Sequence, residues 1–124
     1  MTAGGSRQKR VAERVRADLS EMLARGVVRD PAAEGAIVSD VAVSGDLGVA
    51  TIFLRTLEEA SPERQKRLLA AMGRASGFLR RELGRTLALR RVPEIRFEWD
   101  QGADRAARLE SIFEEIRTTK ERER

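Results

Sequence analysis

The residues with the clearest chemical potential are basic side chains gathered in one stretch of the chain. Residues 64–96 hold ten arginines and lysines against only Glu82 and Glu94, for a net charge of +8. The remaining segments carry −6 over residues 30–63, +4 over 1–29 and −2 over 97–124. The planar guanidinium of arginine binds phosphate through two hydrogen bonds and stacks on bases. The pattern favours a surface that faces a polyanion, although charge alone fits a solvated face in an arginine-rich protein equally well.

Other kinds of chemistry lack their usual donors. The 124 residues include no His, no Cys and no Tyr. Zinc sites, thiol or serine nucleophiles with a histidine base, and a neutral-pH proton switch all depend on those residues. The adjacent carboxylates Glu58 and Glu59 lie in a predicted loop and point apart, so they form no acid–base pair. We expect no enzymatic activity, no metal, no cofactor and no small-molecule substrate.

The chain shows no targeting or membrane signal. The basic residues Arg7, Lys9 and Arg10 are not followed by an apolar stretch, and the longest uncharged run, 47–54, is too short to span a bilayer. The absence of cysteine is compatible with a reducing cytosol. We therefore expect a cytoplasmic protein that does not contact a membrane.

Periodic apolar residues indicate the elements that must position the basic side chains. The first stripe predicts an amphipathic helix over about residues 7–25, with Gly26 as its C-cap. A half-buried strand is predicted over residues 37–43, with Ile37, Val41 and Val43 on one face. After turn residues 44–46, the apolar segment 49–55 is predicted to be the central strand.

The second half of the chain begins with a helix signal. Ser61 is a suitable N-cap and Pro62 a suitable first helical residue. The apolar stripe that follows runs to Leu87 but is interrupted by Gly73 and by Ala75-Ser76-Gly77, so two helices are predicted. A third strand over residues 94–100 places Ile95, Phe97 and Trp99 on one face. A last helix is predicted from Gly102, with an apolar stripe of Leu109, Ile112, Phe113 and Ile116.

This order of elements predicts an α+β fold. It is the αββααβ arrangement of a type II KH domain with an added C-terminal helix. The first two strands form a hairpin, and the third strand pairs parallel to the second, which gives a mixed three-stranded sheet with helices on one face. We expect a flexible N-terminus over residues 1–6, a single domain over 7–116 and a charged flexible tail over 117–124. The GXXG loop that marks KH domains is absent.

Four stretches carry a specific resemblance. The segment from Gly73 to Arg80, Gly-Arg-Ala-Ser-Gly-Phe-Leu-Arg, resembles the interhelical kink of the ribosome-binding factor A family, in which Ala-X-Gly replaces GXXG. Three further stretches match in the right order: Asp30-Pro31, Val43-Ser44-Gly45-Asp46-Leu47, and Arg91-Val92-Pro93-Glu94-Ile95-Arg96-Phe97 followed by Asp100. The match runs from Arg7 to Ile116. Two departures are Ala32, where the family usually has a basic residue, and the arginine-rich tail.

The resemblance implies a monomeric assembly factor that works by binding. Such a factor would bind the free small (30S) ribosomal subunit, assist late maturation of 16S rRNA, including 5′-end processing, and leave before translation; family members are needed especially in the cold. The alternative is a KH-like protein–protein interaction module whose basic face meets an acidic partner. Both readings are electrostatic, so salt dependence does not separate them.

The RNA contacts are then expected on the paired helices and in the connection after them. The candidate RNA-binding residues are Arg74, Ser76, Gly77, Arg80, Arg81, Arg85, Arg90 and Arg91, with Ala75 and Gly77 as the structural kink. A junction at the kink would expose helix N-terminal N–H groups to a phosphate. Reversing Arg80 and Arg81 to glutamate is expected to abolish subunit binding without changing the thermal transition.

Several of these residues have a purely structural alternative. Gly77 either contacts RNA or only permits close helix packing, and Arg90 and Arg91 could form a solvated loop. Phe78, Trp99 and Phe113 are expected in the core, because each lies on or beside an apolar stripe.

Overall fold

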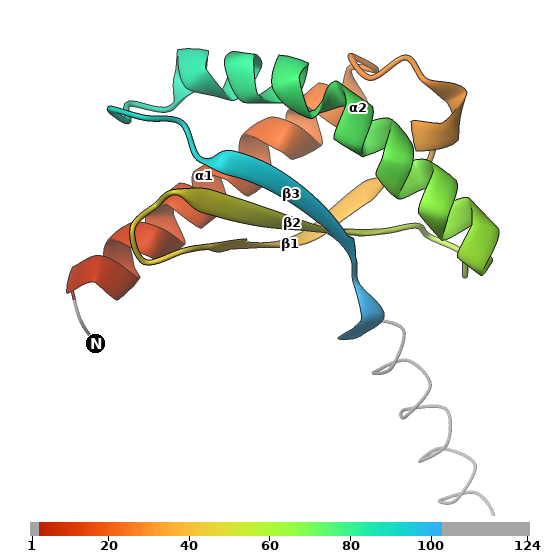
Figure 1. Ribbon diagram of the computed structural model, residues 1–124, viewed down its shortest axis with the longest axis horizontal. Helices are drawn as coiled ribbons and strands as arrows, with labels where there is room; N and C mark the ends of the chain where they lie inside the picture. Colours follow the sequence, from red (N-terminus) through yellow and green to blue (C-terminus); the bar gives the residue numbers. More distant parts are fainter. Residues whose placement is uncertain (1–2, 103–124) are drawn as a thin grey trace, which may run out of the picture.

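The computed structural model describes residues 3–102 as two long helices packed against a small sheet (Figure 1). The elements in chain order are α1 (Ala3–Ala24), the 3₁₀ helix η1 (Pro31–Ala33), β1 (Ile37–Val43), β2 (Val49–Arg55), α2 (Pro62–Thr86) and β3 (Glu94–Trp99). α1 packs on β1, and α2 packs on β3. The predicted α+β class is confirmed. The predicted C-terminal helix, with Phe113, and the tail 117–124 lie outside the described residues.

The sheet has the predicted topology, with β2 in the centre. β1 pairs antiparallel with β2, and β3 pairs parallel with β2. β1 contains a bulge at Ser39, where the register shifts between Val38 and Asp40. Because of the extra residue, Val38 and Val41 both face the core, although they are three apart. The expectation that Ile37 shares a face with Val41 was therefore wrong.

One continuous helix, α2, occupies the segment where two helices were expected. Ser61 is its N-cap, since its side chain accepts a hydrogen bond from the backbone N–H of Arg64, and Pro62 is its first residue. Gly73 and Gly77 each cost about 1 kcal/mol of helix stability relative to alanine. Burial of leucines and a methionine along the inner face contributes more, at about 1.5–3 kcal/mol per fully buried side chain. The helix is therefore maintained through both glycines, although Figure 1 shows that its axis changes direction part-way along.

The core lies between the helices and one face of the sheet. Its largest fully buried side chains are Val15, Leu19, Ile52, Leu54, Leu68, Met72, Leu79, Leu83 and Pro93. Trp99 is buried, as expected. Phe78 is not: 41% of it is exposed, so its assignment to the core was wrong. Phe78 directly precedes Leu79, which is fully buried, and one step along a helix turns a side chain by about 100°.

Candidate nucleic-acid interface

The candidate residues of α2 fall on two different sides of the helix. Arg74, Gly77, Arg81 and Arg85 follow each other at spacings of three and four, so they share one side, and all four are exposed. We call this side, together with Phe78, the outer face of α2. Ser76 and Arg80 lie away from it, and Arg80 reaches the connection that leads into β3. The expected residues therefore do not form one uniform surface.

Arg80 is engaged in holding the chain together. Its Nε donates to the carbonyl oxygen of Pro93 at 3.2 Å, and its Nη2 donates to that of Val92 at 2.9 Å. These two carbonyls belong to the connection between α2 and β3, which also carries Arg90 and Arg91. The guanidinium fork thus fastens this connection to the helix.

Arg74 is held by an acidic partner. Its Nη2 lies 2.6 Å from Oδ2 of Asp30. The Arg74 hydrogen bond and, after it, the backbone N–H of Ala32 hold the pKa of the Asp30 carboxyl below its usual range. Asp30 is also the N-cap of η1. Arg74 therefore presents a partly neutralised charge, although 63% of its side chain is exposed.

The segment Ala75-Ser76-Gly77 is helical and does not begin a new helix. Its backbone N–H groups donate within the continuous helix, so the helix N-terminus expected there as a phosphate site is absent. The Ser76 hydroxyl donates to the carbonyl oxygen of Gly73 at 2.7 Å, a contact that can bend a helix. A Cβ atom built on Gly77 would meet nothing within 4 Å. Within residues 3–102, close packing gives no reason for a glycine at this position.

Arg81 and Arg85 are both exposed on the outer face of α2. Arg85 lies 3.8 Å from Glu82, at the long end of ion-pair distances, and 78% of its side chain is exposed. Arg81 is exposed as well. Side chains of this kind can reach a phosphate without losing a buried contact.

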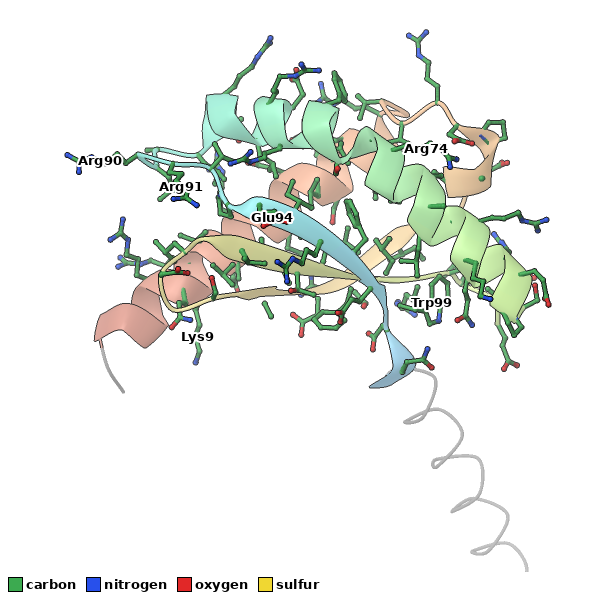
Figure 2. All side chains as sticks on the ribbon, in the orientation of Figure 1. Lys9, Arg74, Arg90, Arg91, Glu94 and Trp99 are labelled. Carbon is green, nitrogen blue, oxygen red and sulfur yellow. The ribbon has the colours of Figure 1, made fainter. Side chains whose placement is uncertain are left out.

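Arg90 and Arg91 meet basic residues from the other end of the sequence. Arg7 of α1 lines a hollow together with Arg90, Arg91 and the hairpin residues Asp46, Leu47 and Gly48. Arg7, Arg10 and Arg14 line a second hollow against residues 86–89. Figure 2 shows Arg90 and Arg91 at the same end of the molecule as Lys9, with Arg74 well apart. We call Arg7, Arg10, Arg14, Arg90 and Arg91 the arginine end.

The three arginines of α1 were missed as candidates by the sequence analysis. The excess of basic residues over residues 1–29 was a signal for them. Nothing in the sequence, however, indicated that the first turns of α1 would lie beside the connection after α2. The acidic hairpin residue Asp46 lies in the same place. Its pKa is lowered by hydrogen bonds from the Ser44 hydroxyl and the Gly48 N–H, with a contribution from the charge of Arg91.

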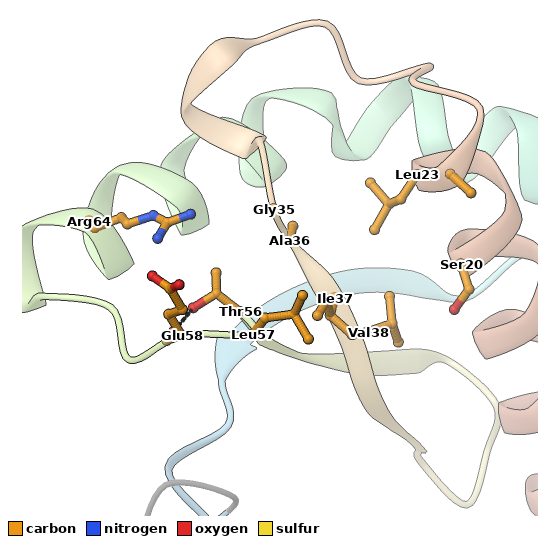
Figure 3. A pocket seen from close by; sticks show the side chains of 11 residues that line it. Ser20, Leu23, Gly35, Ala36, Ile37, Val38, Thr56, Leu57, Glu58 and Arg64 are labelled. Carbon is orange, nitrogen blue, oxygen red and sulfur yellow. Dashed lines mark hydrogen bonds between the residues drawn. The ribbon is translucent and has the colours of Figure 1, made fainter.

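The apolar cavity shown in Figure 3 is separate from this basic surface. It has a volume of about 580 Å³ and lies between the end of α1, the start of β1 and the segment after β2. Leu23, Ile37 and Leu57 line it, with Glu58 and Arg64 at one side. Within residues 3–102, no group of three or more carboxylates is placed to hold a metal ion. In the same range, no helix is long and apolar enough to cross a membrane.

Fold and surface together define a small α+β protein with a mixed three-stranded sheet and exposed arginines along one helix and at one end. The sequence profile of ribosome-binding factor A matches residues 7–113. The chain belongs to the ribosome-binding factor A family. Family members are named as ribosome-binding factors and not as enzymes.

Relatives match over nearly the whole chain. Ribosome-binding factor A of Gloeobacter violaceus is 39% identical over 117 residues, which cover 93% of this chain and 89% of the relative. The Brevibacillus brevis protein of the same name is 37% identical over 118 residues, covering 95% of each.

Solved structures of the family have the same fold. The solution structure from Thermotoga maritima aligns with a TM-score of 0.65 and 30% identity over 74% of this chain and 85% of that one. The crystal structure of ribosome-binding factor A from Thermus thermophilus aligns with a TM-score of 0.62 and 23% identity over 73% of this chain and 93% of that one. A homology model of Thermus thermophilus ribosome-binding factor A (RbfA), fitted into the cryo-EM map of a 30S–RbfA complex, aligns with a TM-score of 0.50 and 27% identity over 69% of this chain and 92% of that one.

Proposed function

We propose that this protein binds the free small ribosomal subunit and assists late maturation of 16S rRNA, including 5′-end processing, without catalysis. The observation that carries the proposal is the family match over residues 7–113. The cryo-EM complex of a structural neighbour with the 30S subunit supports the choice of partner.

The exposed arginines support a contact with the rRNA backbone. We assign phosphate contacts to Arg81 and Arg85 on the outer face of α2 and to the arginine end. Arg74 and Gly77 complete the outer face, where the polynucleotide would compete with Asp30 for the Arg74 guanidinium. Arg80 and Ser76 act on the shape of α2 and its connection. Phosphate contacts carry no sequence information, so recognition of the site rests on the shape of the rRNA.

Further properties of the ribosome-binding factor A family are part of the same proposal. We infer a KH-like domain over residues 7–116, with Ala75 and Gly77 at the bend of α2 in place of GXXG. The protein would act as a monomer in the cytoplasm, with its main importance in the cold.

Sedimentation tests the proposal. Purified protein added to cell extract should co-migrate with free small subunits and little with complete ribosomes. Arg81→Glu with Arg85→Glu should abolish that co-migration. Arg25→Glu with Arg55→Glu is the matched control, because it changes the net charge equally at two exposed residues outside the interface.

Two results would count against the proposal. One is recovery of the protein in light fractions alone at low salt. The other is loss of binding in both double variants, which would show a general charge effect. Competition by polyglutamate, with none by 16S rRNA, would favour the protein–protein module with an acidic partner.

A further inference from the structure

Phe78 is an exposed aromatic ring on an otherwise basic surface. Its exposed fraction is 41%, and only Leu57 is more exposed among the large apolar side chains of residues 3–102. A single exposed apolar residue is ordinary on a protein surface. The surroundings of Phe78 are what make it informative.

Arginines lie on both sides of Phe78 along the helix. Arg74 precedes it by four residues, Arg81 follows by three and Arg85 by seven, and residues at these spacings are neighbours on a helix surface. All three are exposed. Positive charge beside an aromatic ring is the combination by which proteins bind single-stranded nucleic acid: the charges hold the backbone, and a base stacks on the ring.

The helix surface next to the ring is also open. Gly77 has no side chain, and a Cβ there or at Gly73 would meet nothing within 4 Å. A flat group can therefore approach the helix beside Phe78 without displacing a side chain of residues 3–102. An apolar protein partner would suit this position less well, because it would have to cover the arginine charges.

We propose that Phe78 is a stacking site for an unpaired base of the rRNA, flanked by phosphate contacts from Arg81 and Arg85. This inference rests on the proposed function and adds a contact that the phosphate-binding arginines do not supply. Stacking requires an unpaired base, so the site would favour a single-stranded or bulged segment over a continuous helix.

The test measures affinity for purified free small subunits with the full-length chain. Phe78→Leu keeps an apolar side chain of good helix propensity but removes the aromatic face, and Phe78→Ala removes the apolar contact as well. Phe78→Trp keeps the aromatic face. The expected result for Phe78→Leu is a loss of affinity of about five- to a hundredfold. The slope of log K against log salt should stay unchanged, since no phosphate contact is removed. Leu57→Ala, the control at the other exposed apolar residue, should bind as the unmodified protein does.

Phe78→Trp should keep the affinity. The fluorescence of the introduced tryptophan should be quenched on binding, while the buried Trp99 contributes a constant background. Thermal unfolding of each variant checks the fold.

The outcomes separate three cases. Equal affinity of the unmodified protein, Phe78→Leu and Phe78→Ala would overturn the inference while leaving the proposed function intact. A loss of affinity in Phe78→Ala but not in Phe78→Leu would show an apolar contact without stacking, which would also overturn the inference. If the unmodified protein does not bind subunits, the proposed function fails, and this inference falls with it.

Discussion

Arg80 and Arg81 are adjacent in sequence, but their substitution should have opposite consequences. Arg80→Ala removes the hydrogen bonds to Pro93 at 3.2 Å and Val92 at 2.9 Å. Hydrogen bonds from a charged donor contribute about 1.5–3 kcal/mol each when buried. Arg80 is exposed, so we expect a total of roughly 1–2 kcal/mol. For a domain of this size, that corresponds to a drop in Tm of about 4–10 °C.

Arg81→Ala should leave the free energy of unfolding within about 0.5 kcal/mol of its original value, as surface substitutions usually do. It should instead weaken subunit binding. If Arg81 neutralises one phosphate, the negative slope of log K against log salt should become shallower by about 0.7–0.9 in Arg81→Ala. Arg80→Ala should leave that slope unchanged, since its effect on binding comes through the mobility of the connection that carries Arg90 and Arg91.

Lysine variants sharpen the comparison, because lysine keeps the charge but lacks the planar fork. Arg80→Lys should be nearly as destabilised as Arg80→Ala, whereas Arg81→Lys should keep most of its affinity. Thermal unfolding and salt-dependent binding of all four variants test the assignment. An unchanged Tm in Arg80→Ala, with a salt slope reduced by one phosphate equivalent, would refute it and make Arg80 a direct ligand. The double glutamate variant of Arg80 and Arg81 should be destabilised, contrary to the expectation from sequence.

Two further predictions concern α2 and its acidic partner. Gly77→Ala should stabilise the protein by about 0.5–1 kcal/mol, measured by denaturant unfolding, because alanine favours the helix and its Cβ meets open space; a lower unfolding midpoint would show that the chain itself needs this glycine. Asp30→Asn keeps a capping residue but removes the carboxylate whose pKa Arg74 lowers. Because its pKa is lowered in the folded protein, the Asp30 carboxylate stabilises the folded state at pH values above the ordinary aspartate pKa of about 3.9. This stabilisation is lost as the pH falls through the pKa that Asp30 has in the folded state. Thermal scans should therefore show a steeper loss of Tm below about pH 4 in the unmodified protein than in Asp30→Asn, and parallel acid limbs would contradict the assignment.

The sheet could be predicted because its local signals agree. β1 and β2 have the expected bounds, and the apolar sequence of β2 correctly indicated the central position. The bulge at Ser39 could not be predicted, since it is stabilised by distant partners. The Ser39 hydroxyl donates to Oδ2 of Asp100 at 2.6 Å, and its oxygen lies 3.2 Å from the carbonyl oxygen of Phe53. Neither contact can be predicted from the alternation of apolar and polar residues along β1.

The error in α2 has a different cause. Helix propensity correctly marks Gly73 and Gly77 as weak points. Propensity is a local quantity, however, and the buried stripe from Leu68 to Leu83 continues on both sides of them. Tertiary packing therefore outweighs the local signal. The position of Phe78 follows from the same continuity, because an unbroken helix turns it away from Leu79.

The candidate interface depends on which arginines are paired with acidic residues or backbone carbonyls of the protein itself. A count of charges along the sequence does not predict this pairing. Within the +8 segment, Arg74 is paired with Asp30, Arg96 lies 3.7 Å from Glu94, and Arg80 is directed at backbone carbonyls. The connection after α2 instead gains Arg7 and Arg10 from the separate +4 segment. Within the arginine end, Arg14 lies 3.2 Å from Asp18, and on α2 Arg85 lies 3.8 Å from Glu82. Because exposed positive charge attracts a polynucleotide, the strongest attraction should come from Arg7, Arg10, Arg90 and Arg91 together with Arg81 and the largely exposed Arg85. The acidic residues Asp46 and Asp18 at that end reduce the attraction only in part, since two carboxylates face five guanidinium groups there.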